Sequence, residues 1–390
     1  MTLTIEKTDI IKLEETINLL DIGDTLYQLL IISEEELKLK IINKLLDYLS
    51  EKINNPKYKI RVFTTTQGLS STGFIICQID PEYKSYGNSR CATFGWIHAQ
   101  DFESCKLLME ACENYVREQG LKKIRGPINY PKFLGGVGYQ VMGHNAPLMS
   151  GVSFNNPEMN ETHFLKQLGY EPESEYTCVE VVQKNWDKGD SLDENIVIKF
   201  LTPNEIRALK PELMELARNS FYSVLADAPG GNSRIDEMFD SYDIMISYLK
   251  THQAPIKIDP KIFFKVPKFI EFFQASDPIN AVPCCPIALD KSTGEILGAI
   301  MALPNLYQIW KGERLTDINV DTAMVKKEYI GKGIFSTMNN IGQLMCRYRG
   351  AEYFEGTTIW SNNDRAIKTI FPHSILRRKH IVFQKRLLKK

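Results

Sequence analysis

The sequence is poor in residues that bind metal ions. Six histidines are scattered over 390 residues, and the eight cysteines show no CxxC pair of the kind that holds structural zinc. Only Cys284 and Cys285 lie close together, and adjacent cysteines rarely form a disulfide with each other. We therefore predict buried, reduced thiols and no metal site.

Long apolar runs are also missing. No stretch reaches the roughly 18 uninterrupted apolar residues that a membrane span requires. The most apolar N-terminal segment, residues 19–32, is broken by Asp21, Asp24 and Gln28. A basic region followed by an apolar run, typical of a secretory signal, is not present at the N-terminus. We expect a soluble, cytoplasmic protein with no membrane partner.

The charge is nearly balanced, with a formal net charge of -1. Such a chain has no overall field that attracts polyanions, so nucleic acid is not an expected partner. Two basic segments stand out, residues 377–379 and 385–390. We interpret them as a solvated last strand and a frayed end.

With 43% hydrophobic residues, the chain can bury a large core and form two domains. The polar run 183–190 lacks apolar periodicity and predicts the boundary, giving domains 1–186 and 187–390. Periodicity in the first half predicts helix up to about residue 55, then strands 59–65, 72–79 and 90–97, helix 102–120, strand 121–128, helix 161–168 and strand 175–182. In the second half it predicts strand 195–201, helices 203–221 and 235–249, strands 285–288, 295–303 and 315–325, a helix ending at Gly350, strand 352–360, a short helix from residue 363 and strand 380–387.

The same order of elements therefore occurs in both halves of the chain. We predict an α/β fold made of two copies of an α+β sandwich, in which each half of the chain forms a mixed, mostly antiparallel sheet flanked by helices.

The most informative stretch is Val325–Phe335, where a strand passes into a helix through Gly331 and Gly333. Alternation before it predicts that Ile318, Val320 and Met324 share one face of the strand. The unpaired N–H groups and the helix dipole at such a start favour a phosphate or pyrophosphate, which glycine lets approach closely. Alternatively, the glycines serve only the positive φ of the turn.

Two other segments can be interpreted either as ligand-binding sites or as purely structural segments. The glycine-rich run 134–151 is either a phosphate cradle or a long loop, and we favour the loop because no amphipathic helix follows it directly. Residues 257–271 alternate basic and aromatic types. They either line a nucleotide pocket or form a packed loop with outward lysines, which we favour.

The second half, about residues 195–390, resembles the GCN5-related N-acetyltransferase (GNAT) superfamily. Val325 matches the end of the family's main strand, Gly331-Lys332-Gly333-Ile334 the centre of its phosphate turn, and Asn363 with Ala366 its downstream asparagine-helix motif. The resemblance implies acetyl-CoA or another acyl-CoA as co-substrate, with its pyrophosphate on the N–H groups of the turn and its pantetheine arm beside the strand. The cofactor-binding residues so implied are Met324, Val325, Ile330, Gly331, Lys332, Gly333, Ile334, Phe335 and Asn363.

The same resemblance suggests transfer of the acyl group to an amine of a small molecule or peptide. Asp321 or Glu355 would take the amine proton, although both also fit ordinary solvated strand carboxylates. The tyrosine that many members place on the short helix is Ile370 here, and His373 either substitutes for it or is structural.

Two turn positions also depart from the pattern. Ile330 replaces an Arg or Gln, and Phe335 replaces a small residue, while Lys332 could supply the missing charge.

The first half looks like a second, degenerate copy. Its turn, residues 97–103, has no glycine and carries Asp101 and Glu103, which would repel phosphate. We predict that this copy holds no cofactor and acts as a scaffold or a wall of the substrate pocket.

Three functions remain open: an acyl-CoA-dependent N-acyltransferase, a catalytically silent acyl-CoA sensor or assembly module, and an aminoacyl- or long-chain acyltransferase. Homodimerisation is a further expectation.

Overall fold

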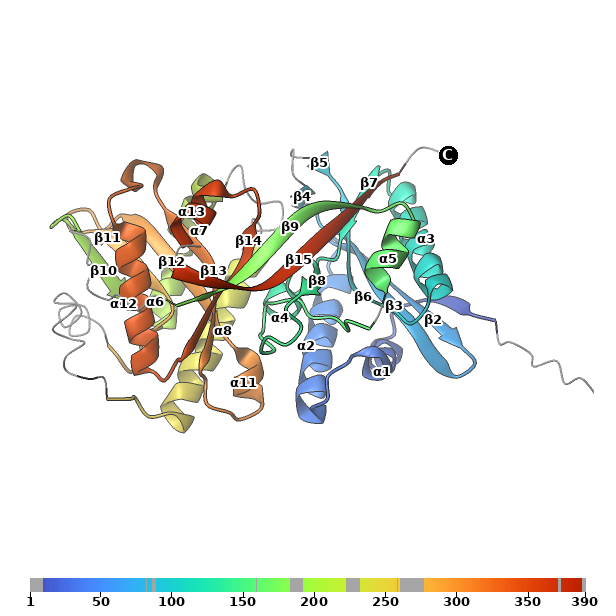
Figure 1. Ribbon diagram of the computed structural model, residues 1–390, viewed down its shortest axis with the longest axis horizontal. Coiled ribbons are helices and arrows are strands. Elements are labelled where there is room, and N and C mark those ends of the chain that lie inside the picture. Colours follow the sequence, from blue (N-terminus) through green and yellow to red (C-terminus); the bar gives the residue numbers. More distant parts are fainter. Residues whose placement is uncertain are drawn as a thin grey trace, which may run out of the picture. The chain divides into compact units, whose positions relative to one another are not determined.

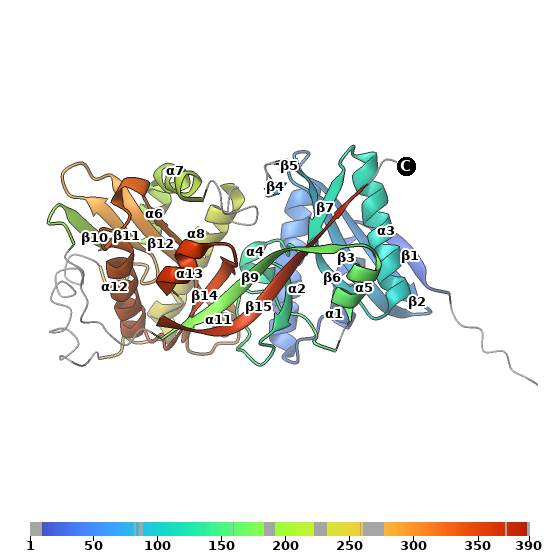
Figure 2. The same ribbon diagram turned by 45° about the horizontal axis from the view of Figure 1, so that its top comes forward.

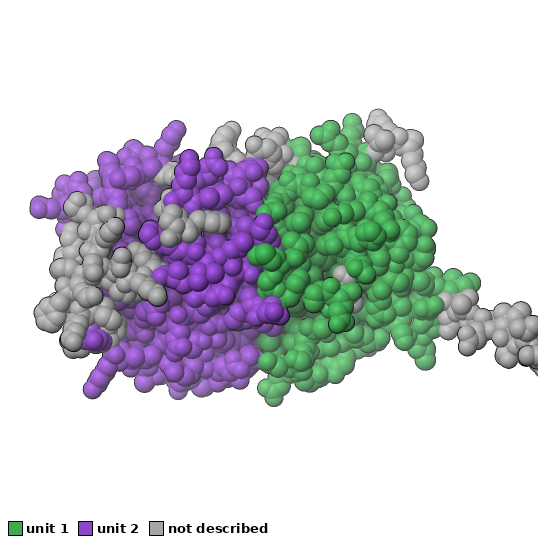
Figure 3. Space-filling model, viewed as in Figure 1, with its two compact units in different colours: residues 1–144, 153–175, 380–390 green, residues 145–152, 176–379 purple. Residues whose placement is uncertain are grey.

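The computed structural model describes residues 10–81, 83–85, 89–158, 160–182, 192–221, 232–257, 259, 277–370 and 373–387. These residues form two compact units (Figure 3). The first comprises residues 1–144, 153–175 and 380–390, and the second residues 145–152 and 176–379. The predicted boundary between residues 186 and 187, and most of segment 257–271, lie outside the described residues.

The first unit is built on a sheet of strand order β1-β2-β3-β6-β7-β15. Along this order of described strands, β6 and β7 are parallel and the other neighbours are antiparallel. Its strands are β1 (Lys12–Thr16), β2 (Lys59–Gln67), β3 (Ser70–Ile79), β6 (Ala92–Ala99), β7 (Lys123–Gly126) and the end of β15 (Ser374–Arg386), with the short β4 (Lys84–Ser85), β5 (Ser89–Arg90) and β8 (Tyr139–Met142). Its helices are α1 (Leu19–Leu29), α2 (Glu35–Ile53), α3 (Phe102–Glu118), α4 (Lys132–Gly135) and α5 (Glu161–Gln167).

The core of this unit forms under α3. Cys105, Leu108 and Cys112, spaced by three and four residues, are fully buried in one cluster with strand residues such as Phe94. The helix begins at Asp101, whose carboxylate accepts a hydrogen bond from the Ser104 N–H at 2.8 Å. The acidic residue that the sequence singled out is therefore the N-cap of α3.

The second unit has the strand order β9-β14-β13-β12-β11-β10. The strands are β9 (Glu171–Val181), β10 (Ile196–Phe200), β11 (Pro286–Asp290), β12 (Ile296–Pro304), β13 (Asp317–Val325) and β14 (Tyr353–Trp360). The helices are α6 (Pro203–Ala208), α7 (Lys210–Phe221), α8 (Asn232–His252), α11 (Leu306–Trp310), α12 (Ile334–Tyr348) and α13 (Asp364–Ile370), with a 3-10 turn at Lys327–Tyr329. Helix α12 lies against one face of this sheet, and α7 and α8 lie against the other (Figures 1 and 2).

Two strands pass from one unit into the other. β9 begins in the first unit and continues into the second at Tyr176, and β15 returns to the first unit at His380. Within the first unit, Phe383–Arg386 of β15 pair with β7. Within the second, Tyr176–Glu180 of β9 pair with β14. Each sheet is thus completed by a strand from the other half of the sequence.

The predicted fold class is confirmed, and most predicted elements are present. The structure adds β1 and α11, divides the predicted helix 203–221 into α6 and α7, and places β8 within the predicted glycine-rich loop, the start of which overlaps the end of α4. All eight cysteines are free and buried, as predicted. The interpretation of residues 377–379 as solvated is wrong for Arg378, which is 2% exposed.

Candidate functional site

Strands β13 and β14 of the second unit start as partners and then separate. They pair in parallel from Asp317 with Tyr353 as far as Val320 with Gly356. Both strands are described to their ends, at Val325 and Trp360, and no further register partners join them. β13 keeps its pairing with β12 out to Val325. Among the described residues, Thr322–Val325 therefore have no ladder partner on the β14 side, and this edge can pair with an extended ligand.

A β-bulge marks the point of separation. Thr322 of β13 pairs with Met301 of β12, and Asn319 pairs with Leu303. These two pairs are three residues apart on β13 but two residues apart on β12, so β13 carries an extra residue. This residue reverses the alternation: Val320 and then Ala323 and Val325 pack on the core cluster beneath α12. The prediction that Met324 shares a face with Val320 is wrong for this reason, because regular alternation does not include a bulge.

The turn after β13 ends in the N-terminus of α12. Gly331 and Gly333 have φ values of 82° and 74°, and a Cβ on Gly331 would meet nothing within 4 Å. Gly333 is the N-cap, and the first helical bond runs from the Thr337 N–H to its carbonyl at 3.0 Å. The N–H groups of Ile334 and Phe335 precede that bond and have no acceptor within the helix. The turn therefore combines left-handed glycines with a helix N-terminus that can bind an anion.

Three side chains around this turn matter for a bound anion: Phe335, Ile330 and Lys332. Phe335 packs against the core cluster beneath α12, so its ring is directed inward. Ile330 is 37% exposed. The Lys332 ammonium group lies 4.5 Å from the centre of the Tyr329 ring, which holds a positive charge at the turn. Of the two departures from the resemblance, Phe335 is therefore part of the core and Ile330 is exposed.

Downstream, Asn363 caps α13. Its Oδ1 accepts a hydrogen bond from the Ala366 N–H at 3.1 Å, and its own N–H donates to the Trp360 carbonyl at 2.9 Å. The side chain of Ile370 lies outside the described residues. His373 is exposed, and its carbonyl accepts the Val182 N–H at 3.0 Å.

Glu355 is not the solvated strand carboxylate considered from the sequence. It is fully buried on β14 and forms a two-point ion pair with Arg378, at 2.7 Å from Nε to Oε1 and 3.0 Å from an NH2 group to Oε2. The Tyr353 hydroxyl donates to Oε2 at 2.7 Å. Both carboxylate oxygens are engaged, which is the pattern of a structural ion pair.

Asp321 lies at the bulge, on the open part of β13. It is partly buried, and its Oδ2 accepts the Thr322 hydroxyl at 2.8 Å. Burial raises the pKa of Tyr242 on α8, and the Asp321 carboxylate contributes to that rise. Asp321 therefore lies close to α8. Of the three catalytic candidates, Asp321 is the carboxylate at the point where the two strands part.

The first unit repeats this arrangement but fills it with its own chain. β6 carries the same kind of bulge, between Gly95 and His98, and Trp96 there has a φ of 50°. β6 pairs with β7 only at Ala92 and Thr93. Beyond that point, β6 bonds to the segment that follows β7: the Ile128 N–H donates to the Phe94 carbonyl at 2.7 Å.

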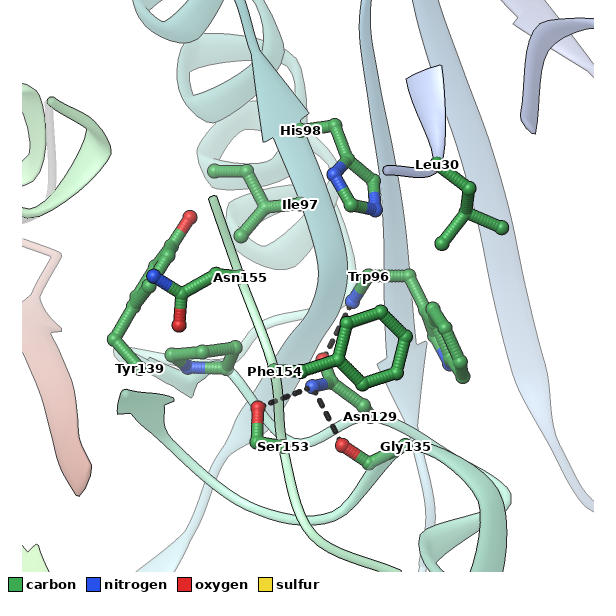
Figure 4. A pocket seen from close by; sticks show the side chains of 11 residues that line it. Leu30, Trp96, Ile97, His98, Asn129, Gly135, Tyr139, Ser153, Phe154 and Asn155 are labelled. Carbon is green, nitrogen blue, oxygen red and sulfur yellow. Dashed lines mark hydrogen bonds between the residues drawn. The ribbon is translucent and has the colours of Figure 1, made fainter. Parts of the chain in front are cut away.

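Asn129 completes this closure (Figure 4). Its Oδ1 accepts the Trp96 N–H at 2.7 Å, and its Nδ2 donates to the Gly135 carbonyl and the Ser153 hydroxyl. A pocket of about 360 Å³ of empty space, part of it open to solvent, remains beside His98 and Tyr139. The edge that has no ladder partner in the second unit is thus occupied by the chain itself in the first.

In the described part of the chain, no helix has the length and apolar character needed to cross a bilayer. Nor do three or more His, Cys, Asp or Glu side chains gather there in a way that could hold a metal ion.

The chain forms a doubled α/β sandwich with an open strand pair and a glycine-bounded helix start. Solved structures with a similar fold show which class of fold this is. A tandem GNAT protein from the clavulanic acid biosynthesis pathway aligns over 98% of this chain and 100% of its own, with a TM-score of 0.55 and 8% identity. A GCN5-related N-acetyltransferase from Sphaerobacter thermophilus aligns over 96% of this chain and 95% of its own, with a TM-score of 0.50 and 9% identity.

A third similar structure is a fungal multi-domain GH3 β-N-acetylglucosaminidase that contains a GCN5-related glucosamine N-acetyltransferase region. It matches 97% of this chain with a TM-score of 0.54 and 14% identity, and this chain spans 38% of its length. No family model and no curated protein matches the sequence. The chain therefore has the tandem fold of GCN5-related N-acetyltransferases.

Proposed function

We propose that this protein is an acyl-CoA-dependent N-acyltransferase that uses acetyl-CoA or a related acyl-CoA and acylates an amine of a small molecule or peptide. The observation that carries the proposal is the open edge of β13, which leads directly into the glycine-bounded N-terminus of α12. The tandem GNAT fold supports it. The second unit is the proposed cofactor-binding unit.

In this proposal the pyrophosphate of the acyl-CoA binds at the N–H groups of residues 331–335, with Lys332 adding positive charge. The pantetheine arm extends along residues 321–325 of β13 as an added strand. Backbone groups make most of these contacts, so the side chains at Ile330 and Phe335 are of minor importance. The capping of α13 by Asn363 orders the segment after β14.

The proposed chemistry is direct acyl transfer. The amine nitrogen attacks the thioester carbonyl, a C–N bond forms, and the C–S bond breaks with release of the CoA thiolate. Backbone N–H groups on the open edge of β13 stabilise the oxyanion. Asp321 is the proposed base that accepts the amine proton, directly or through water. Glu355 is omitted from this role because its oxygens are already bonded, and His373 remains a candidate donor of a proton to the thiolate.

Titration calorimetry with acetyl-CoA and with CoA tests the cofactor assignment. Gly333→Glu places a carboxylate where the pyrophosphate would bind, and we expect it to weaken binding of both ligands at least tenfold. Gly294→Glu is the matched control for backbone strain, because Gly294 has a positive φ of 75°, close to the 74° of Gly333, but lies in the β11–β12 turn. Equal affinities for wild type and Gly333→Glu would disprove the site.

The second candidate, a catalytically silent acyl-CoA sensor, is favoured by the engagement of Glu355 in a structural pair. Release of free CoA thiol from acetyl-CoA across a panel of amines separates the two. An enzyme gives amine-dependent release that Asp321→Asn reduces. A sensor binds acetyl-CoA but gives the same slow release with and without amine.

A further inference from the structure

The outer strand of the first unit's sheet is β1. It stands at the end of the strand order and pairs antiparallel with β2 along one side. All five of its residues are in register, from Lys12 with Thr66 to Thr16 with Val62, and no bulge interrupts them. No described strand pairs with the other side, which we call the β1 edge. At alternate residues the N–H and C=O groups of such an edge point outward, where they can bond to another strand.

Exposed apolar side chains are concentrated around the β1 edge. Fourteen large apolar side chains are exposed in the described part of the chain, and seven of them lie within residues 10–39. These seven are Ile10, Leu13, Ile17, Leu20, Tyr27, Ile31 and Leu39. The first four lie on β1 or within four residues of it. Such a concentration is typical of an interaction surface, and this one also offers free backbone groups.

The charges of β1 favour one partner, a second copy of the same strand. When two copies pair antiparallel about a two-fold axis, one residue lies opposite its own copy, because hydrogen-bonded and non-hydrogen-bonded pairs alternate. A centre at Lys12, Glu14 or Glu15 places like charges directly opposite each other, which is destabilising. A centre at Thr16 requires pairing as far as residue 20, which is in α1. Leu13 is the residue of β1 that meets neither obstacle.

A centre at Leu13 also brings opposite charges together. It places Lys12 opposite Glu14 of the second copy, and the two-fold axis repeats this pair, so one register forms two ion pairs. All three side chains are exposed. Glu15 adds no repulsion, because its carboxylate already pairs with Arg61 of β2 at 2.7 Å.

We propose that the β1 edge binds the β1 edge of a second copy of this chain, as an antiparallel pair centred on Leu13. The first-unit sheets of the two chains then continue into each other across the two-fold axis. An interface built on one short strand is at the small end of specific interfaces, so the dimer has a dissociation constant in the micromolar range. The first unit, which has no proposed cofactor site, is thereby the unit through which the chain dimerises.

Sedimentation velocity of the full chain at increasing micromolar concentrations tests the proposal. Lys12→Glu brings carboxylates together across the pairing, and Glu14→Lys brings ammonium groups together. Each variant raises the dissociation constant at least about tenfold. An equal mixture of the two variants dimerises like the wild type, because an acidic edge then meets a basic one. The double variant Lys12→Glu/Glu14→Lys restores both ion pairs and dimerises as well.

Lys291→Glu is the matched control, because Lys291 is exposed in the β11–β12 turn of the second unit and its substitution makes the same change in net charge as Lys12→Glu. It leaves the dissociation constant within about twofold of the wild type, since distant exposed charges are screened. A chain that is monomeric throughout the micromolar range overturns the inference, and so does a dimer that neither single variant weakens. Dissociation of both single variants without dimerisation of their mixture overturns the pairing centred on Leu13. These outcomes leave the proposed function intact, because the binding of acetyl-CoA tests it separately.

Discussion

Two ionisable residues of the first unit, the buried Glu161 and the partly buried His98, have pKa values shifted in opposite directions. Burial raises the pKa of Glu161 from 4.5 to about 7, although hydrogen bonds from the Ala99 N–H and Tyr139 act against the rise. Burial lowers the pKa of His98 from 6.5 to about 4, and its Nε2 has no hydrogen-bond partner among the described residues. Both groups are therefore neutral in the folded protein near pH 6.

These shifts have opposite effects on stability. A carboxyl with a raised folded-state pKa loses its stabilising contribution as pH rises from about 4.5 to about 7. A histidine with a lowered pKa loses its contribution as pH falls from about 6.5 to about 4. Each effect amounts to roughly 3 kcal/mol over its window, so in the wild type the two slopes largely cancel.

We predict that single substitutions reveal the separate slopes. Glu161→Gln keeps an acceptor for the Ala99 N–H, and its free energy of unfolding should rise with pH between pH 4.5 and 6.5 relative to the wild type. His98→Gln should show the opposite trend, a fall as pH rises. Urea unfolding at several pH values measures both. Parallel pH profiles for the wild type and the two variants would contradict the assigned protonation states.

At the scale of the elements, the ion pair between Glu355 and Arg378 fastens β15 to β14. The Arg378 guanidinium also donates to the Pro147 carbonyl at 2.5 Å, so it holds the segment at 145–152 as well. Both side chains are at most 2% exposed. Each charge depends on the other, since neither has access to water.

We predict that Arg378→Ala lowers the free energy of unfolding by about 3–5 kcal/mol, because it leaves a buried carboxylate without its partner. Its neighbour provides the control: Arg377 is 41% exposed and pairs with Glu180 on β9. Arg377→Ala should cost less than about 1 kcal/mol. Denaturant unfolding compares the two, and equal losses would show that the buried pair has no special role.

The elements differ in how far the sequence predicts them. The start of α12 could be predicted because glycine spacing, strand alternation and helix periodicity all change within residues 325–335. The side of the sheet on which Met324 lies could not be predicted, because the bulge in β13 has no sequence signal. The burial of Arg378 could not be predicted, because three consecutive basic residues are typical of a solvated face and its partner Glu355 is 23 positions away in sequence. Internal closure of the first unit by Asn129 depends on contacts that no local pattern encodes.

At the scale of the whole molecule, neither unit is a continuous piece of sequence. Residues 380–390 belong to the first unit, where Phe383 is fully buried in the core and the Leu387 N–H donates to the Lys122 carbonyl at 2.8 Å. The first unit therefore depends on a strand that follows the entire second unit in sequence.

We predict that ending the chain after residue 379 unfolds or loosens the first unit selectively. Hydrogen exchange should show faster exchange of the amides in β6, β7 and α3, while β13 and α12 of the second unit keep their protection. A chain ended after residue 387 serves as the control and should match the full chain. Unchanged protection of β7 in the shorter chain would show that β15 is dispensable there.

The passage of β15 back into the first unit also has a consequence for synthesis on the ribosome. Domains generally fold as they emerge, at about 5–20 residues per second. After Glu175 has emerged, residues 176–379 must still be made before the strand that pairs with β7 exists. At that speed β7 waits roughly 10 to 40 seconds with one edge unpaired. An unpaired edge can bind other strands, so the nascent first unit is exposed to aggregation until β15 has been made.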